Sequence, residues 1–183
     1  MYPGFLPRCL ETSCNEIGAS LTGDHRTNSN SIPVVGWCLF EVIKQPLLLR
    51  RLREEVAAAL VTDPGTGERS FDVQQLLSLP LLQSLYVESM RLHVSLWIMR
   101  DVVGPVTVDG FELEKGSVLQ AATDIAHRDE EVWGTPEHPA AEFWPERHIK
   151  YVESVDKSGK VTTKPEFSMA ANASHFFPYG RST

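Results

Sequence analysis

Two arginines and one glutamate are spaced so that they could form a charged clamp. Glu88 and Arg91 are three residues apart within an expected helix, so both side chains would project from one face. Arg147 follows much later, after an expected small sheet. The planar fork of arginine can bond a carboxylate through two parallel hydrogen bonds, which lysine cannot do. Taken alone, Glu88 and Arg91 favour a plainer interpretation, an exposed ion pair worth roughly a few tenths of a kcal/mol.

The cysteines and His127 offer weaker signals. Cys9, Cys14 and Cys38 are an odd number without a Cys-x-x-Cys pair, which argues against a disulfide framework and against a zinc site. We therefore expect reduced thiols in an intracellular chain. Cys38 lies in an apolar helical stretch, where a small buried thiol is ordinary packing. His127 is typical of a structural or exposed histidine, because no cysteine or carboxylate pattern surrounds it.

Composition places these residues in a globular chain. The 183 residues are 42% hydrophobic and 22% charged, which is typical of one ordinary folded domain. The formal charge of −7 is spread along the chain, and Arg50, Arg51 and Arg53 are interleaved with Glu54 and Glu55. No basic face is indicated, so we expect no nucleic-acid partner.

The longest stretch without charged or strongly polar residues is too short to cross a membrane. It runs from Ile32 to Phe40 and contains Pro33 and Gly36, whereas a spanning helix needs about 20 apolar residues. The first ten residues lack a basic start followed by an apolar core. We therefore expect neither a membrane anchor nor a secretory signal in this chain.

The sequence predicts that the clamp is positioned by helices together with a small sheet. Asn15 to about Lys44 predicts one long helix that Pro33 interrupts, and Pro46 starts a second helix. On that second helix, Arg50 with Glu54 and Arg51 with Glu55 predict a solvated face. Further helices are expected at 72–78 and from Pro80 to about His93. The fold class is mainly α with a small β-sheet.

The second half of the chain shows fewer regular patterns. Residues 106–113 predict a hairpin with a two-residue Asp-Gly turn, and 117–121 could add a third strand. From Ala122 to His175 we expect a short helix at 129–132 and otherwise irregular chain. So long an irregular stretch would count against a compact domain unless contacts with the rest of the fold hold it in place.

Three motifs, in the order in which they occur along the chain, resemble the carboxy-terminal core of a cytochrome P450. Glu88-Ser-Met-Arg91 followed by Phe143-Trp-Pro-Glu-Arg147 is similar to the Glu-Arg-Arg triad of that family. Phe176-Phe-Pro-Tyr-Gly180 resembles the opening of the haem-binding loop. Ser29-Asn-Ser-Ile-Pro33 matches the place where the long I helix crosses the haem. The resemblance extends from about Asn15 to Gly180.

The I-helix motif resembles a variant form. Most relatives carry an acid followed by threonine, whereas Asn30-Ser31-Ile32-Pro33 is similar to the Asn-Thr-x-Pro group that includes cholesterol 7-alpha-hydroxylase and prostacyclin synthase. An amide and a hydroxyl beside a proline-broken turn could hold water or dioxygen over the iron. The plainer alternative is that Asn30 and Ser31 cap a helical segment that begins at Pro33.

The resemblance implies a role for each remaining candidate. Glu88, Arg91 and Arg147 would be structural, and Asn30 and Ser31 would face the oxygen as catalytic residues. Arg100 would pair with a haem propionate, although a surface residue beside a strand would look the same. The other implied contacts are Phe177 and Gly180 for the cofactor, and Ser95, Leu96 and Trp97 for the substrate.

The resemblance also implies a reaction and its requirements. The family's haem-thiolate monooxygenases insert one atom of dioxygen into an apolar substrate, here a sterol or lipid-like one, with a haem held by a cysteine thiolate. That cysteine is expected just beyond Thr183, so no metal ligand is expected within the chain. A full-length relative would reside at the endoplasmic reticulum membrane and would use an NADPH-dependent reductase. This chain, lacking an anchor, would otherwise be cytoplasmic.

The chain is expected to be a partial cytochrome P450 domain over residues 1–183. The amino-terminal half and the region from the haem-ligand cysteine onward are expected to be missing, so the isolated chain would be inactive. Arg181-Ser-Thr183 matches neither common form of the haem loop, which suggests a truncated or mis-spliced reading. Two alternatives remain open: a non-catalytic remnant that acts as a binding or interaction module, and an unstable product without a role.

Overall fold

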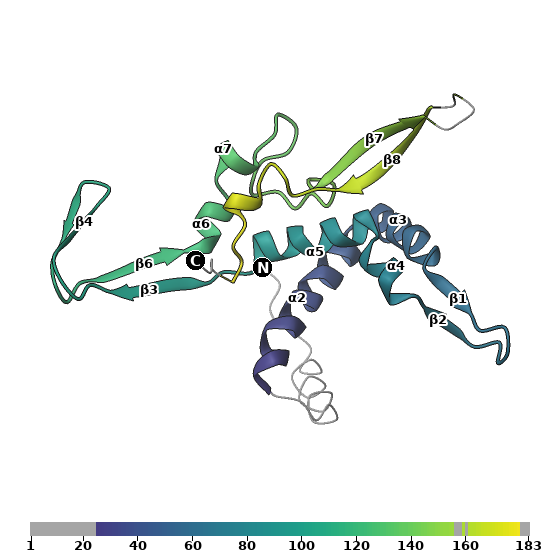
Figure 1. Ribbon diagram of the computed structural model, residues 1–183, viewed down its shortest axis with the longest axis horizontal. Coiled ribbons are helices and arrows are strands. Elements are labelled where there is room, and N and C mark those ends of the chain that lie inside the picture. Colours follow the sequence, from purple (N-terminus) through teal and green to yellow (C-terminus); the bar gives the residue numbers. More distant parts are fainter. Residues whose placement is uncertain (1–24, 156–158, 160, 180–183) are drawn as a thin grey trace, which may run out of the picture.

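The computed structural model describes residues 25–155, 159 and 161–179 of the chain, with the backbone alone for residues 25–30. The predicted helical stretch 15–24 and Gly180 lie outside the described residues. Helices form the centre of the molecule, and pairs of strands extend from them as arms (Figure 1).

The helices follow the sequence prediction closely. Their bounds are α2 (His25–Lys44), α3 (Pro46–Ala57), α4 (Val73–Leu77) and α5 (Pro80–His93). Pro46 and Pro80 occupy the first turns of α3 and α5, where proline's missing N–H costs no helical hydrogen bond. Asp72 caps α4, because its side chain accepts hydrogen bonds from the N–H groups of Gln74 and Gln75.

Pro33 does not divide the long helix, which is assigned as one element from His25 to Lys44. The sharp change of direction comes instead at Gln45, where Ser31–Lys44 and Pro46–Ala57 meet at 116°. Among the described residues no single helix is long and apolar enough to cross a membrane; only this bent pair passes by length and composition.

Two clusters of buried apolar side chains hold α5 in place. The first joins it to α2 and α3, and its buried members are Val42, Leu48, Leu81 and Leu85. The second joins it to the earlier part of α2, with Val34, Val87 and Met90 buried and Phe167, Met169 and Phe176 packed against them. Because α5 contributes to both clusters, it is the element on which the rest of the described fold is assembled.

The strands form antiparallel pairs rather than one sheet. The pairs are β1 (Leu60–Thr62) with β2 (Arg69–Phe71), β3 (Trp97–Asp101) with β6 (Val118–Ala122), β4 (Val106–Val108) with β5 (Phe111–Leu113), and β7 (Ile149–Val155) with β8 (Val161–Phe167). The predicted hairpin at 106–113 is confirmed. Its turn residues Asp109 and Gly110 have φ values of 49° and 82°, as a tight hairpin turn of this type requires.

Two expectations about strands are corrected. The strand near 117–121 is present as β6, but it pairs with β3 and does not extend the 106–113 hairpin. Residues 122–175 are not mostly irregular, because β7 and β8 form a long ladder there in which Tyr151 lies opposite Pro165. Charged residues on these strands and a proline within β8 masked the strand pattern, since proline usually argues against a strand. The remaining short elements are α6 (Thr123–His127), the expected α7 (Glu130–Trp133) and a 3-10 turn at Ala173–His175.

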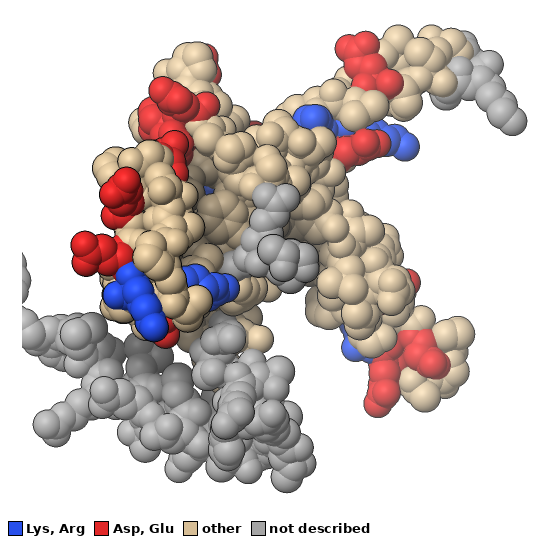
Figure 2. Space-filling model, turned by 60° about the vertical axis from the view of Figure 1, so that its left-hand side comes forward, with Lys and Arg blue, Asp and Glu red and all other residues tan. Residues whose placement is uncertain are grey.

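The expected solvated ion pair between Arg51 and Glu55 is also corrected. Glu55 is half-buried and accepts hydrogen bonds from the N–H groups of Leu81 and Leu82 at 2.9 and 3.0 Å. It thereby caps α5 from the neighbouring helix, where its negative charge suits the positive end of the helix dipole. Arg51 pairs with Glu146 instead. On the face shown in Figure 2, Lys and Arg lie among Asp and Glu and form no continuous basic surface.

Candidate functional site

A buried carboxylate lies between two arginines on α5 and the segment before β7. The Glu88 and Arg91 side chains are both 0% exposed, and that of Arg147 is 3% exposed. Arg91 donates from Nε and Nη2 to the two oxygens of Glu88, each at 2.8 Å. Arg147 donates from Nε to Glu88 Oε1 at 3.0 Å. The exposed surface pair that the sequence also allowed is therefore ruled out.

Two further donors complete the coordination of the Glu88 carboxylate. The backbone N–H of Trp144 donates to Oε1 at 3.1 Å, and Nε2 of buried His148 contacts Oε2 at 3.2 Å. Burial alone would raise the pKa of Glu88. The hydrogen bonds from Arg91 and His148 and the charges of both arginines outweigh burial and lower that pKa to about 2. Glu88 is therefore ionised throughout the physiological pH range.

The outer guanidinium nitrogens bind backbone carbonyl groups. Arg91 Nη1 donates to the carbonyls of His127 and of Ala140, the latter at 2.7 Å. Arg147 donates to the Trp133 carbonyl and, through Nη2, to those of Pro139 and Glu142 at 3.0 Å each. The indole of Trp133 lies 5.2 Å from the Arg91 guanidinium carbon, which adds a cation–π contact. These bonds pin the chain between α6 and β7 to α5, which explains how so loop-rich a stretch is ordered.

The sequence indicates the three charged residues of this clamp but not its other members. His148 directly follows Arg147, yet a lone histidine in that position carries no signal of a buried carboxylate partner. The backbone donors and acceptors could not have been found at all, because every residue type except proline offers the same N–H and C=O groups.

A small cavity brings together three segments that the sequence singled out. Pro33 of α2, Ser95 after α5 and Tyr179 ahead of Gly180 all line a cavity of about 180 Å³. Trp37 and His93 form another part of its wall, with their rings stacked at 4.1 Å and an interplanar angle of 2°. The three segments are far apart in sequence, so only the fold makes them one surface.

The other predicted contact residues lie on exposed surface or next to this cavity. Ser31 is exposed on α2, and of Asn30 only the helical backbone is described. Leu96 and Trp97 are 38% and 61% exposed, and Ser95 donates to Asp124 at 3.0 Å. Neither the location nor the contacts of these residues test the roles predicted for them, so these roles stay predictions.

Two predicted cofactor contacts have contrasting surroundings. Arg100 is exposed on β3, where its Nη1 donates to the neighbouring Met99 carbonyl at 2.8 Å. Its guanidinium therefore faces solvent and is accessible to an anion. Phe177 is half-buried, and its backbone N–H lies 3.1 Å from His127 Nε2. The segment that contains Phe177 is thus tied to α6.

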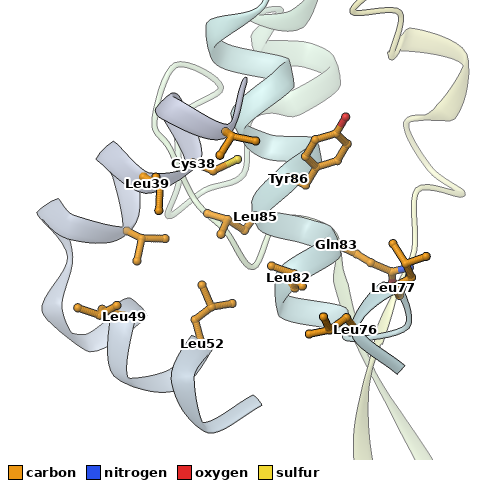
Figure 3. A pocket seen from close by; sticks show the side chains of 12 residues that line it. Cys38, Leu39, Leu49, Leu52, Leu76, Leu77, Leu82, Gln83, Leu85 and Tyr86 are labelled. Carbon is orange, nitrogen blue, oxygen red and sulfur yellow. The ribbon is translucent and has the colours of Figure 1, made fainter. Parts of the chain in front are cut away.

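A larger cavity lies between the helices and is almost wholly apolar. It has a volume of about 520 Å³ and is lined from α2, α3 and α5 and the end of α4. In Figure 3, Leu49 and Leu52 of α3 lie across the cavity from Leu82 and Leu85 of α5. Cys38 lines this cavity and not the smaller one. Burial raises the pKa of the Cys38 thiol, which disfavours a thiolate there.

The smaller cavity and the residues next to it fit one wall of a haem site. The smaller cavity combines apolar side chains with an open side, and exposed apolar residues and a cationic side chain follow on β3. Its volume is below the roughly 300–1,000 Å³ of a complete ligand pocket, so it can supply only part of an enclosure. Within the described residues no group of His, Cys, Asp and Glu is arranged to hold a metal ion.

Comparison with known proteins agrees with this arrangement. A model of the cytochrome P450 family matches residues 19–159. The cytochrome P450 monooxygenase calL of Penicillium decumbens is 45% identical over 170 residues, which cover 93% of this chain and 30% of that protein. Human steroid 21-hydroxylase is 29% identical over 132 residues, 71% of this chain and 25% of its own length. The chain thus spans about a third or less of the relatives it matches. The match over most of this chain shows that it belongs to the cytochrome P450 family.

Proposed function

We propose that this chain forms part of a haem-thiolate monooxygenase that inserts one atom of dioxygen into an apolar substrate. The observation that carries the proposal is the cavity at which Pro33, Ser95 and Tyr179 meet. Each of these residues comes from a segment with a proposed role: the oxygen-facing turn, the substrate contact and the cofactor loop. The buried clamp supports it further, because it orders the chain on which the loop depends.

The residues proposed to hold the cofactor are Arg100, Phe177 and Gly180. Haem, when bound, supplies the redox and oxygen chemistry that side chains cannot provide. Arg100 would pair with a propionate, since its guanidinium is exposed and always charged. Phe177 and Gly180 would contact the cofactor from the loop that follows β8.

The substrate side is formed by different residues. The exposed apolar surfaces of Leu96 and Trp97 would contact the substrate and exclude water, and Ser95 would border it. Asn30 and Ser31 would hold a water molecule or dioxygen by hydrogen bonds. A sterol or lipid-like substrate fits the apolar surface and the proposed Asn-Thr-x-Pro group. The complete protein would receive electrons from an NADPH-dependent reductase at the endoplasmic reticulum membrane.

Haem titration of the whole chain tests this proposal. We expect loose binding, and Arg100→Gln should weaken it roughly three- to tenfold, because a partly exposed charge-assisted pair is lost. Arg69→Gln is the matched control, since Arg69 is an exposed arginine on β2, a different strand pair. Equal haem affinity for the two variants would remove the role proposed for Arg100.

The reduced, carbon-monoxide-treated sample tests the iron ligand. We expect no thiolate-type Soret band from this chain alone, because burial raises the pKa of the Cys38 thiol and Cys38 lines the other cavity. A strongly red-shifted band that Cys38→Ser abolishes would show that Cys38 is the ligand. Failure to bind haem at all would favour the alternative function, a non-catalytic binding module, for which the 520 Å³ apolar cavity is the natural site.

A further inference from the structure

His127 joins three parts of the molecule that are distant in sequence. The residue is 0% exposed, and its backbone carbonyl accepts a hydrogen bond from Arg91 of the clamp. Its ring packs against the segment after the 3-10 turn, with ring centroids 5.6 Å from Phe176 and 5.3 Å from Phe177. The ring also meets Trp133 of α7 edge-on at 6.3 Å. His127 therefore lies between the clamp and the proposed cofactor loop.

The contact with Phe177 defines the protonation state of the ring. The backbone N–H of Phe177 can only donate, and it lies 3.1 Å from His127 Nε2. Nε2 must therefore accept, which requires a neutral ring with its proton on Nδ1. Within the described residues Nδ1 has no hydrogen-bond partner. Among the described residues, the Phe177 N–H is therefore the geometrically defined hydrogen-bond partner of this ring, and a weaker contact with the backbone of Arg91 acts on its pKa.

The charges around the ring favour its neutral form. Arg91 faces it from α5, and Asp124 and Arg128 lie on α6 and just after it. The groups contributed by α7 and by the loop are the uncharged rings of Trp133, Phe176 and Phe177. Burial and, next, the positive charge of Arg91 lower the pKa of His127 to about 4, against the weaker opposing effects of a backbone contact with Arg91 and of the Asp124 charge.

We propose that His127 is a positioning residue, whose neutral ring holds the segment Phe176–Pro178 against the clamp by accepting the Phe177 N–H. A protonated ring would turn an N–H toward the N–H of Phe177, so the hydrogen bond would be lost and two donors would face each other. Protonation therefore releases the loop. The benefit to haem binding rests on the proposed function, but the holding of the loop does not.

Amide hydrogen exchange at Phe177, expressed as protection relative to the unfolded rate at each pH, tests this inference in the whole chain. As pH falls from about 7 to about 4, we expect protection of the Phe177 amide to drop about tenfold or more, while α5 amides near Arg91 stay protected. His127→Gln keeps an acceptor at similar reach and does not titrate, so protection should persist at low pH. His127→Leu should lose it at every pH.

The matched control is His175→Gln, because His175 is an exposed histidine in the same segment. It should leave the wild-type pH profile unchanged. The inference is overturned if Phe177 protection in the wild type does not depend on pH, if it is lost together with that of α5, or if Gln and Leu at position 127 behave alike. The wild-type profile alone decides the matter if a variant does not fold.

Haem titration of the same samples at neutral pH keeps the two proposals separate. If protection of the Phe177 amide depends on pH but haem does not bind, the positioning role stays in place and the proposed function is refuted. Haem binding with pH-independent protection would do the reverse.

Discussion

The clamp around Glu88 and the exposed apolar face of α2 both adjoin the same helix, α5, yet they differ in completeness. Glu88 and Arg91 are fully buried and hydrogen-bonded within the described residues. On α2, by contrast, Val35, Leu39 and Ile43 are 54%, 57% and 71% exposed. Within the described residues the clamp has its full set of partners, whereas the apolar face of α2 is partly exposed.

The difference follows from the cost of leaving each kind of group without its partner. A buried charge that lacks its partner costs several kcal/mol, so a charged cluster must be complete to exist at all. Exposed apolar surface costs only about 25 cal/mol per Å², so a partly covered face is tolerated. Among the described residues an intact clamp therefore occurs beside an open apolar face.

The largest expected effect is at the centre of the clamp. Glu88→Ala would leave two buried arginines uncompensated and should lower the free energy of unfolding by about 3–5 kcal/mol. Chemical denaturation followed by circular dichroism measures this loss. Glu112→Ala on exposed β5 is the control and should change stability by less than about 0.5 kcal/mol. A loss well under about 1 kcal/mol for Glu88→Ala would mean that the clamp does not hold the fold.

Acid should weaken the clamp in a pH window that can be stated. The folded pKa of Glu88 is about 2, below its ordinary value of 4.5. Its ionisation therefore contributes about 3 kcal/mol of stability above about pH 4.5, and this is lost as pH falls toward 2. His127, whose pKa is lowered from 6.5 to about 4, adds a loss of the same sign in the higher window between those values.

Denaturation of His127→Gln over the same pH range separates the two groups. We expect the loss above about pH 4.5 to disappear in this variant and the loss below it to remain, because Glu88 still titrates. Stability that is flat down to about pH 2.5 would show that Glu88 is not held by its positive partners.

The smallest expected effect on stability belongs to the apolar face. Ile43→Gln should change the free energy of unfolding by less than about 0.5 kcal/mol, because the side chain is 71% exposed. It should nevertheless reduce self-association, measured by sedimentation velocity, since exposed apolar patches drive association. Phe111→Gln is the control, because Phe111 is equally exposed on β5, away from this face. Equal reductions for both variants would show that association does not depend on α2.

The amino-acid sequence by itself determined the helices and the charged residues of the clamp. Pro46 and Pro80 start their helices because proline suits a first turn, and the spacing of Glu88 and Arg91 puts them on one face of α5. The Asp109-Gly110 turn was equally readable, because both residues tolerate positive φ. The sequence was sufficient wherever a helix start, a shared helix face or a turn is determined by residues only a few positions apart.

Only the tertiary structure decided which distant groups meet. His148 at Glu88, Glu55 at the start of α5 and His127 at Phe177 are long-range contacts that no local spacing indicates. The pairing of β6 with β3 was likewise hidden, because a strand's own sequence does not name its neighbour. The partners in most of these contacts include backbone N–H or C=O groups, which are nearly the same in every residue, so their identity depends on where the packed helices bring them.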